Sequence, residues 1–153
     1  NHLNKKNKPQ IVNISRKKIT ERIAKAEAII CFKNSIFKKI QTMRTKKGNI
    51  ENIAIIAGIM GAKDTSRIIP LCHNIAIDYI NIDITKIEKS HSLKISSEVK
   101  TNSNTGVEME ALVAVTISCL TIYDICKSLS KDIIIKKIKL ISKSGGKSDY
   151  GIN

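Results

Sequence analysis

The sequence predicts an α+β fold in which an antiparallel sheet carries helices on one face. Segments with the two-residue apolar period of strands alternate with segments of helical period, and 153 residues suffice for one domain with an ordinary core. The predicted order is strand, helix, two hairpin strands, helix and strand. That order is typical of a ferredoxin-like sandwich.

The N-terminal part contains the first predicted strand. Residues 1–9 are polar and basic, so we expect a flexible leader there, ahead of a single domain over residues 10–153. The short alternation at residues 11–14 predicts an edge strand. Residues 19–32 fit a strand or a helix by periodicity, and the β-branched residues at their end favour a strand.

Two helices are predicted after this strand. Residues 35–41 predict a short helix with Ser35 as its candidate cap. Apolar side chains recur at helical intervals over residues 50–69, which predicts a longer helix. Gly58 and Gly61 weaken the helix propensity of this segment, so we expect another backbone to approach it closely there.

The second half of the chain predicts a hairpin, a long helix and a final strand. Residues 75–87 and 93–99 alternate between apolar and polar side chains, which predicts a hairpin with one buried face. Residues 111–129 form a helical pattern that is apolar most of the way round, and residues 133–141 predict a basic strand. Because one sheet covers only one side of such a helix, we expect its second side to pack against another subunit.

The amino-acid composition limits which ligands and which cellular location we expect for the protein. The net charge is +14, but the lysines are scattered along the chain together with abundant Asn and Ile, which is typical of a codon bias. Aromatic residues make up 3% and offer little for base stacking, so a small polyphosphate is as good a candidate ligand as a polynucleotide. No apolar run is long enough to span a membrane, and the four cysteines form no CxxC pair. We therefore expect a cytoplasmic protein without a metal site.

Two acids stand where the long apolar segment begins. Glu108 and Glu110 lie two residues apart in a chain that is poor in acids. On a helix they would point about 200° apart, so they can face one ligand together only if the backbone is still extended there. The alternative is that both are ordinary acids of a first helical turn, where they interact with the helix dipole.

Two further pairs are candidates for chemistry. His73, beside Cys72, is a candidate acid–base group, and the alternative is a buried turn histidine. Asp124 and Lys127 lie three residues apart on one helical face. Asp124 interrupts an apolar run, where burial without a partner would be unfavourable, so this pair is a candidate for proton transfer. The alternative is a surface ion pair.

The spacing of these candidates constrains the site. Glu110 and Asp124 would lie about 21 Å apart on a continuous helix, at ~1.5 Å per residue. No small substrate bridges that distance. Either the two helix ends serve different sites, or one site combines the acids of one subunit with Asp124 and Lys127 of a neighbour. The basic, glycine-containing loops at residues 46–48 and 143–147 are suited to phosphate oxygens.

Together these segments resemble the MoaC family of molybdenum cofactor biosynthesis. The matching blocks stand in the family's order and cover most of the chain after about residue 45: residues 47–48, 57–63 with 65–66, 69–73, 105–112, 120–127 and 143–148. The family usually has an aspartate after the Lys-Gly pair, and this chain has Asn49 there. Asn49 keeps a hydrogen-bonding side chain but loses the charge.

The resemblance implies a lyase, cyclic pyranopterin monophosphate synthase. Such an enzyme converts the cyclised GTP intermediate, 3′,8-cyclo-7,8-dihydroguanosine triphosphate, to cyclic pyranopterin monophosphate and releases pyrophosphate. It implies a homohexamer, a trimer of dimers with sites at the dimer interface, and we predict no cofactor. The implied catalytic residues are Asp124, Lys127 and Lys47. The implied substrate-binding residues are Leu71, Cys72, His73, Glu108, Met109, Glu110 and Lys143.

Two other functions stay open from the residues alone. A small basic RNA-binding module with the same sandwich would show salt-sensitive RNA affinity that survives the loss of both acids. A regulatory domain would bind GTP derivatives without turnover. Only the synthase predicts the release of pyrophosphate.

Overall fold

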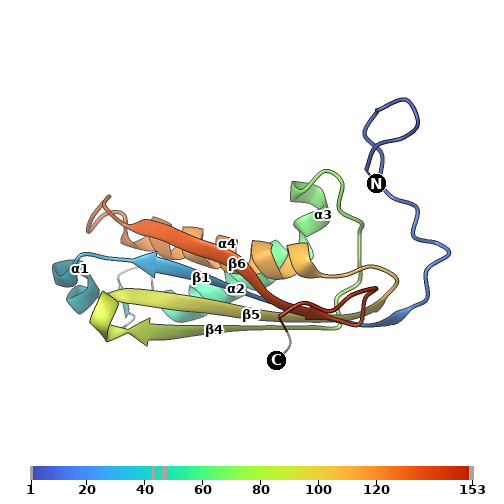
Figure 1. Cartoon of the computed structure of the whole chain (residues 1–153). Coiled ribbons are helices and arrows are strands. Elements are labelled where there is room, and N and C mark those ends of the chain that lie inside the picture. Colours follow the sequence, from blue (N-terminus) through green and yellow to red (C-terminus); the bar gives the residue numbers. More distant parts are fainter. Residues whose placement is uncertain (1, 43, 46–47, 152–153) are drawn as a thin grey trace.

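A four-stranded antiparallel sheet with the order β4-β5-β1-β6 forms the centre of the protein (Figure 1). The computed structural model describes residues 2–42, 44–45 and 48–151. The strands are β1 (Thr20–Cys31), β4 (Tyr79–Ile87), β5 (Ser92–Ser103) and β6 (Ile134–Ser144). Two crossovers, from β1 to β4 and from β5 to β6, each pass over one intervening strand. This is the predicted ferredoxin-like arrangement.

Helices cover one face of this sheet. α2 (Ile50–Lys63) lies in the first crossover and α4 (Glu108–Cys126) in the second, and the two helices pack against each other as well as on the strands. The shorter elements are α1 (Asn34–Lys39), α3 (Thr65–Ile68), the 3-10 turn η1 (Glu88–Ser90), and a small ladder between β2 (Arg44–Thr45) and β3 (Gly48–Asn49).

The core lies between the helices and the sheet because side chains alternate along each strand. The apolar residues on the buried face of the two central strands are Ala24, Ala26, Ala28, Ile30, Leu93, Ile95 and Val99. On the outer face, Glu98 pairs with Lys25 at 2.7 Å and with Lys100 at 2.9 Å. The sheet therefore has one apolar face under the helices and one charged face.

The close approach expected at the glycines of α2 is present. A Cβ atom on Gly58 would lie 2.8 Å from the carbonyl oxygen of Ala114 and 2.2 Å from Oγ of Ser118, both on α4. The Ser118 hydroxyl donates a 2.9 Å hydrogen bond to the carbonyl oxygen of Ala54. Next to Gly61 stands the side chain of Ile117 instead of a backbone atom. Gly58 thus marks the point where the two helix backbones nearly touch.

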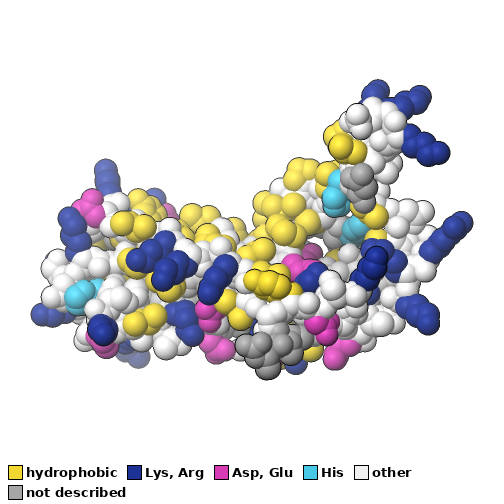
Figure 2. Space-filling model, in the orientation of Figure 1, with side chains coloured by type: hydrophobic (Ala, Val, Ile, Leu, Met, Phe, Trp, Pro, Cys, Tyr) yellow, Lys and Arg dark blue, Asp and Glu magenta, His cyan; other side chains and the backbone are white. Residues whose placement is uncertain are grey.

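The outer surface of the helical layer is apolar. Ile56 and Met60 of α2 are each 59% exposed, and Leu120 of α4 is 51% exposed. Figure 2 shows apolar side chains gathered on the upper face of the molecule. By length and composition alone α4 could cross a membrane, yet more than half of it is buried inside the protein, as in a core helix. That its outer side contacts another subunit stays a prediction.

Four local predictions were wrong. Residues 11–14 form no strand, because two of their carbonyl groups accept hydrogen bonds from side chains instead of from a strand. Ser35 does not cap α1, whose N-cap is Lys33. The long helix breaks at Asp64, which ends α2 and precedes α3. The hairpin begins at Tyr79, and the carbonyl oxygen of Ala76, ahead of it, accepts a hydrogen bond from the Thr101 side chain.

Candidate active site

The two acids occupy the first turn of α4, which begins at Glu108. An extended backbone there is therefore excluded, and the two side chains take different surroundings. Glu108 is partly exposed, and its Oε1 lies 3.1 Å from Nζ of Lys143, at the end of β6. Glu110 is 4% exposed. Glu108 is paired at a charged edge and Glu110 is buried, yet both residues line the same cavity, which their expected 200° separation on a helix did not predict.

Burial is the main influence on the pKa of Glu110. It raises the pKa of this carboxyl to about 7, and the nearby charge of Glu108 also raises it, while a hydrogen bond from the residue's own backbone N–H lowers it. The start of a helix favours an anion by about 0.3–1 kcal/mol. Burying an unpaired carboxylate costs roughly several kcal/mol, so desolvation outweighs the dipole.

One cavity of about 320 Å³ brings together all the uncharged and acidic residues implied to bind substrate. Its wall includes Leu71, Cys72, His73, Glu108, Met109 and Glu110. They come from the loop between α3 and β4 and from the first turn of α4, two segments far apart in the sequence. The sequence order alone does not show this convergence.

Cys72 is a poor nucleophile in this cavity. Burial raises the pKa of its thiol, and the negative charge of Glu110 raises it further. Since the thiolate is the reactive form, a neutral Cys72 contributes a small, weakly polar surface to the wall. This agrees with a binding role for Cys72 and argues against covalent catalysis by it.

The N-terminal segment closes one side of the same cavity. His73 Nε2 lies 2.7 Å from the carbonyl oxygen of Val12. A carbonyl oxygen only accepts, so Nε2 carries the proton and donates it. Asn104 Nδ2 donates a 3.0 Å hydrogen bond to the carbonyl oxygen of Ile14. The sequence did not predict that this segment contributes to the cavity, because the alternation of residues 11–14 indicated a strand.

A second, basic cavity of about 550 Å³ adjoins the first, and the two share Lys17, Thr105, Gly106 and Glu108 in their walls. Its cationic residues are Lys17, Lys18, Arg22, Lys143 and Lys147. The Glu108–Lys143 ion pair lies at the boundary between the two cavities. Five cations around one hollow suit an anionic ligand such as a polyphosphate.

Hydrogen bonds hold the loop after β6, which brings Lys147 to the wall of this cavity near Lys143. Lys143 and Tyr150 exchange two backbone hydrogen bonds. The N–H of Gly145 donates to Asp149 Oδ1 at 3.1 Å, and its carbonyl oxygen accepts from Thr20 Oγ1 at 2.7 Å. The N–H of Gly145 is therefore not available to a phosphate, whereas five cationic side chains line the cavity.

Asp124 and Lys127 lie at the opposite end of α4 and line neither cavity. Asp124 Oδ1 is 2.6 Å from Lys127 Nζ, and the side chains are 57% and 55% exposed. Their mutual hydrogen bond raises the pKa of Lys127. The expectation that Asp124 is partly buried was wrong for the single chain, since its side of α4 faces outward.

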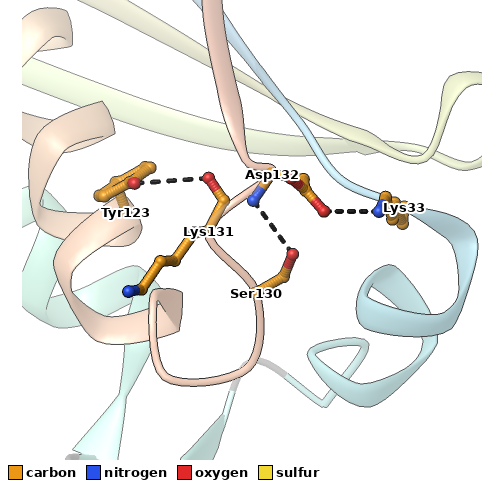
Figure 3. Close-up of polar contacts among 5 residues, drawn as sticks. All are labelled: Lys33, Tyr123, Ser130, Lys131 and Asp132. Carbon is orange, nitrogen blue, oxygen red and sulfur yellow. Dashed lines mark hydrogen bonds and ion pairs between the residues drawn. The ribbon is translucent and has the colours of Figure 1, made fainter.

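Polar contacts fix the loop that follows this end of α4 (Figure 3). The Tyr123 hydroxyl donates to the carbonyl oxygen of Lys131 at 3.5 Å, and the Asp132 N–H donates to Ser130 Oγ at 3.1 Å. Lys33, just before α1, lies 2.5 Å from Asp132 Oδ2. The exposed Asp124–Lys127 pair thus stands beside an ordered loop.

Lys47 lies outside the described residues, so its predicted catalytic role stays a prediction. The residue at the position of the family's aspartate has a structural role: Asn49 is the N-cap of α2, and its Oδ1 accepts from the Asn52 N–H at 3.2 Å. Within residues 2–42, 44–45 and 48–151, no group of three His, Cys, Asp or Glu side chains is placed to hold a metal ion.

Comparisons with known proteins identify the family. Residues 11–146 match the sequence profile of the MoaC family. Cyclic pyranopterin monophosphate synthase of Helicobacter pylori (strain Shi470) is 48% identical over 97% of this chain and 95% of that protein. The synthase of Helicobacter hepaticus is 49% identical over 96% of this chain and 92% of its own length. Molybdenum cofactor biosynthesis protein 1 of Drosophila melanogaster is 42% identical over 97% of this chain and 26% of its own length. The chain belongs to the MoaC family.

Proposed function

We propose that the protein is a cyclic pyranopterin monophosphate synthase, a lyase that converts the cyclised GTP intermediate to cyclic pyranopterin monophosphate and pyrophosphate. One observation carries the proposal: six of the seven residues implied to bind substrate line one cavity, and the seventh, Lys143, lines the adjoining cavity with four other cations. The names of the near full-length bacterial relatives support it.

The two cavities divide the substrate between them. The smaller one, with the carboxyl of Glu110 and the imidazole of His73 in its wall, takes the purine-derived ring. The larger one, with Arg22 and Lys143, takes the triphosphate. The ion pair between Glu108 and Lys143 then lies where ring and phosphates meet, and incoming phosphate oxygens compete with Glu108 for the lysine.

A neighbouring subunit completes this site. Asp124 lies about 21 Å along α4 from Glu110, at ~1.5 Å per residue, and Lys127 lies one turn farther, which is too far for one small substrate. Both are exposed, and the helical layer between the two ends presents apolar side chains such as Leu120 to the outside. We therefore assign proton transfer to Asp124 and Lys127 of a second copy, in a homohexamer built as a trimer of dimers. No disulfide links the four cysteines, all of which lie in the described part of the chain, and this supports a reducing, cytoplasmic location.

The direct test is the release of pyrophosphate from the purified cyclised GTP intermediate. The wild-type protein should produce cyclic pyranopterin monophosphate and pyrophosphate in equal amounts. Asp124→Asn and Lys127→Ala should each lower kcat by about 10²-fold or more, because they remove a proton-transfer group. Glu88→Gln, on the turn between β4 and β5, is the control and should leave kcat unchanged. Normal turnover by both site variants would exclude the assigned roles. Salt-sensitive RNA binding without any product would favour the RNA-binding alternative.

A further inference from the structure

Glu110 is the only acid in the core among the described residues. The chain has a net charge of +14, yet no described lysine or arginine forms an ion pair with Glu110, whereas Glu108 is paired with Lys143. The side chain of Glu110 lies in the cavity wall. A buried carboxyl without a cation in a basic protein is an arrangement that disfavours the ionised form.

The groups around Glu110 also disfavour its ionised form. Glu108 contributes negative charge, and Cys72 contributes an uncharged thiol. His73 uses its Nε2 proton on the carbonyl oxygen of Val12. Lys17 is a cation of the cavity wall, but it makes no ion pair with Glu110, and His2 lies in the wall as well. These surroundings disfavour a second negative charge, and burial raises the pKa of Glu110 to about 7.

Binding of the proposed substrate shifts this balance further. A ring that fills the cavity excludes water from the carboxyl, and three phosphates in the adjoining cavity add negative charge nearby. Both changes favour the protonated form of Glu110 over the carboxylate. The phosphates also draw Lys143 toward themselves, which leaves the charge of Glu108 less compensated.

We propose that Glu110 is protonated in the complex and donates a hydrogen bond to an acceptor on the substrate ring, either a carbonyl oxygen or an unprotonated ring nitrogen. Binding above neutral pH then takes up one proton from solvent. Glu110 thus selects ligands that present an acceptor at this position. The inference rests on the proposed function, because that function supplies the ring and the phosphates.

The test is a pH series of binding with the cyclised GTP intermediate, on Asp124→Asn protein to prevent turnover. Affinity should fall as pH rises through about 7, approaching tenfold per pH unit. Calorimetry in two buffers of different ionisation enthalpy should show uptake of close to one proton at the alkaline end. The kcat/KM of the wild-type protein should show the same alkaline decline.

Glu110→Gln, introduced into the Asp124→Asn protein, keeps a neutral hydrogen-bond donor at this position. The double variant should bind with the affinity that the Asp124→Asn protein reaches at acidic pH, and this affinity should not depend on pH. Glu98→Gln, on the outer face of the sheet, is the matched control and should keep the slope. Affinity that rises with pH would overturn the inference, as would a folded Glu110→Gln protein that fails to bind at acidic pH. A ¹³C NMR titration of the ligand-free protein that gave Glu110 the ordinary pKa of a glutamate would overturn the inference but not the proposed function. Absence of both binding and pyrophosphate release by the wild-type protein would overturn the proposed function as well.

Discussion

At the scale of single residues, Asn49 shows how a departure from the family pattern can keep its structural role. The Oδ1 atom accepts the Asn52 N–H at the start of α2, and an aspartate would accept it equally well. Asn49→Ala should therefore lower the free energy of unfolding by about 1 kcal/mol, whereas Asn49→Asp should leave it unchanged. Chemical denaturation measures both. Asn52→Ala, which keeps the backbone donor, is the control; equal stability of Asn49→Ala and the wild type would refute the capping role.

The acids show what could and could not be predicted for single residues. The resemblance to a family identified Glu108 and Glu110 as binding residues, and the structure places both in one cavity wall. Their different environments depend on where α4 begins and on the loop that carries Cys72, which the local sequence does not specify. Asp124 illustrates the reverse case. Its apolar neighbours in sequence indicated burial, but the helix turns its side chain outward.

At the scale of secondary structure elements, the packing of α2 on α4 depends on Gly58. Gly58→Ala adds helix propensity of about 1 kcal/mol. The new methyl group would meet a backbone carbonyl oxygen and Ser118 Oγ, so we expect a net loss of stability of roughly 1–3 kcal/mol. Thermal unfolding measures this loss. Gly61→Ala is the matched control, because the new methyl group would meet side-chain atoms of Ile117 and no backbone atom, and it should cost less. A stabilised Gly58→Ala protein would contradict the close approach.

Regular periodicity allowed most elements to be predicted, and tertiary contacts explain the exceptions. β1, β5, β6 and α4 lie close to the predicted segments, and the first part of the predicted helix over residues 50–69 forms α2. β1, β5 and the two long helices have buried residues that recur with the period of a strand or a helix. The alternation of residues 11–14 is too short to decide between a strand and a segment held by side chains. Thr101 of β5 likewise donates its hydroxyl proton to the carbonyl oxygen of Ala76, ahead of β4, at 2.6 Å. Such bonds between distant residues leave no local pattern.

At the scale of the whole molecule, the fold brings four separate segments to the N-terminal end of α4. They are the N-terminal segment, the loop after α3, the turn before α4 and the loop after β6. The ferredoxin-like order of elements could be predicted from the sequence, but the cluster of Lys17, Lys18 and Arg22 next to Lys143 could not. It depends on the register between β1 and β6, which pairs Ala24 with Lys143.

The central claim is that α4 contributes to two active sites, with its first turn in one and its last turn in another. Mixing two inactive variants tests it most directly: Lys143→Glu, altered at the cavity, and Asp124→Asn, altered at the far end of the helix. In a shared site, each mixed interface contains one intact combination, so re-associated subunits should recover about a quarter of the wild-type rate of pyrophosphate release. Native mass spectrometry verifies that mixed oligomers have formed. Mixed oligomers as inactive as the separate variants would contradict the shared site.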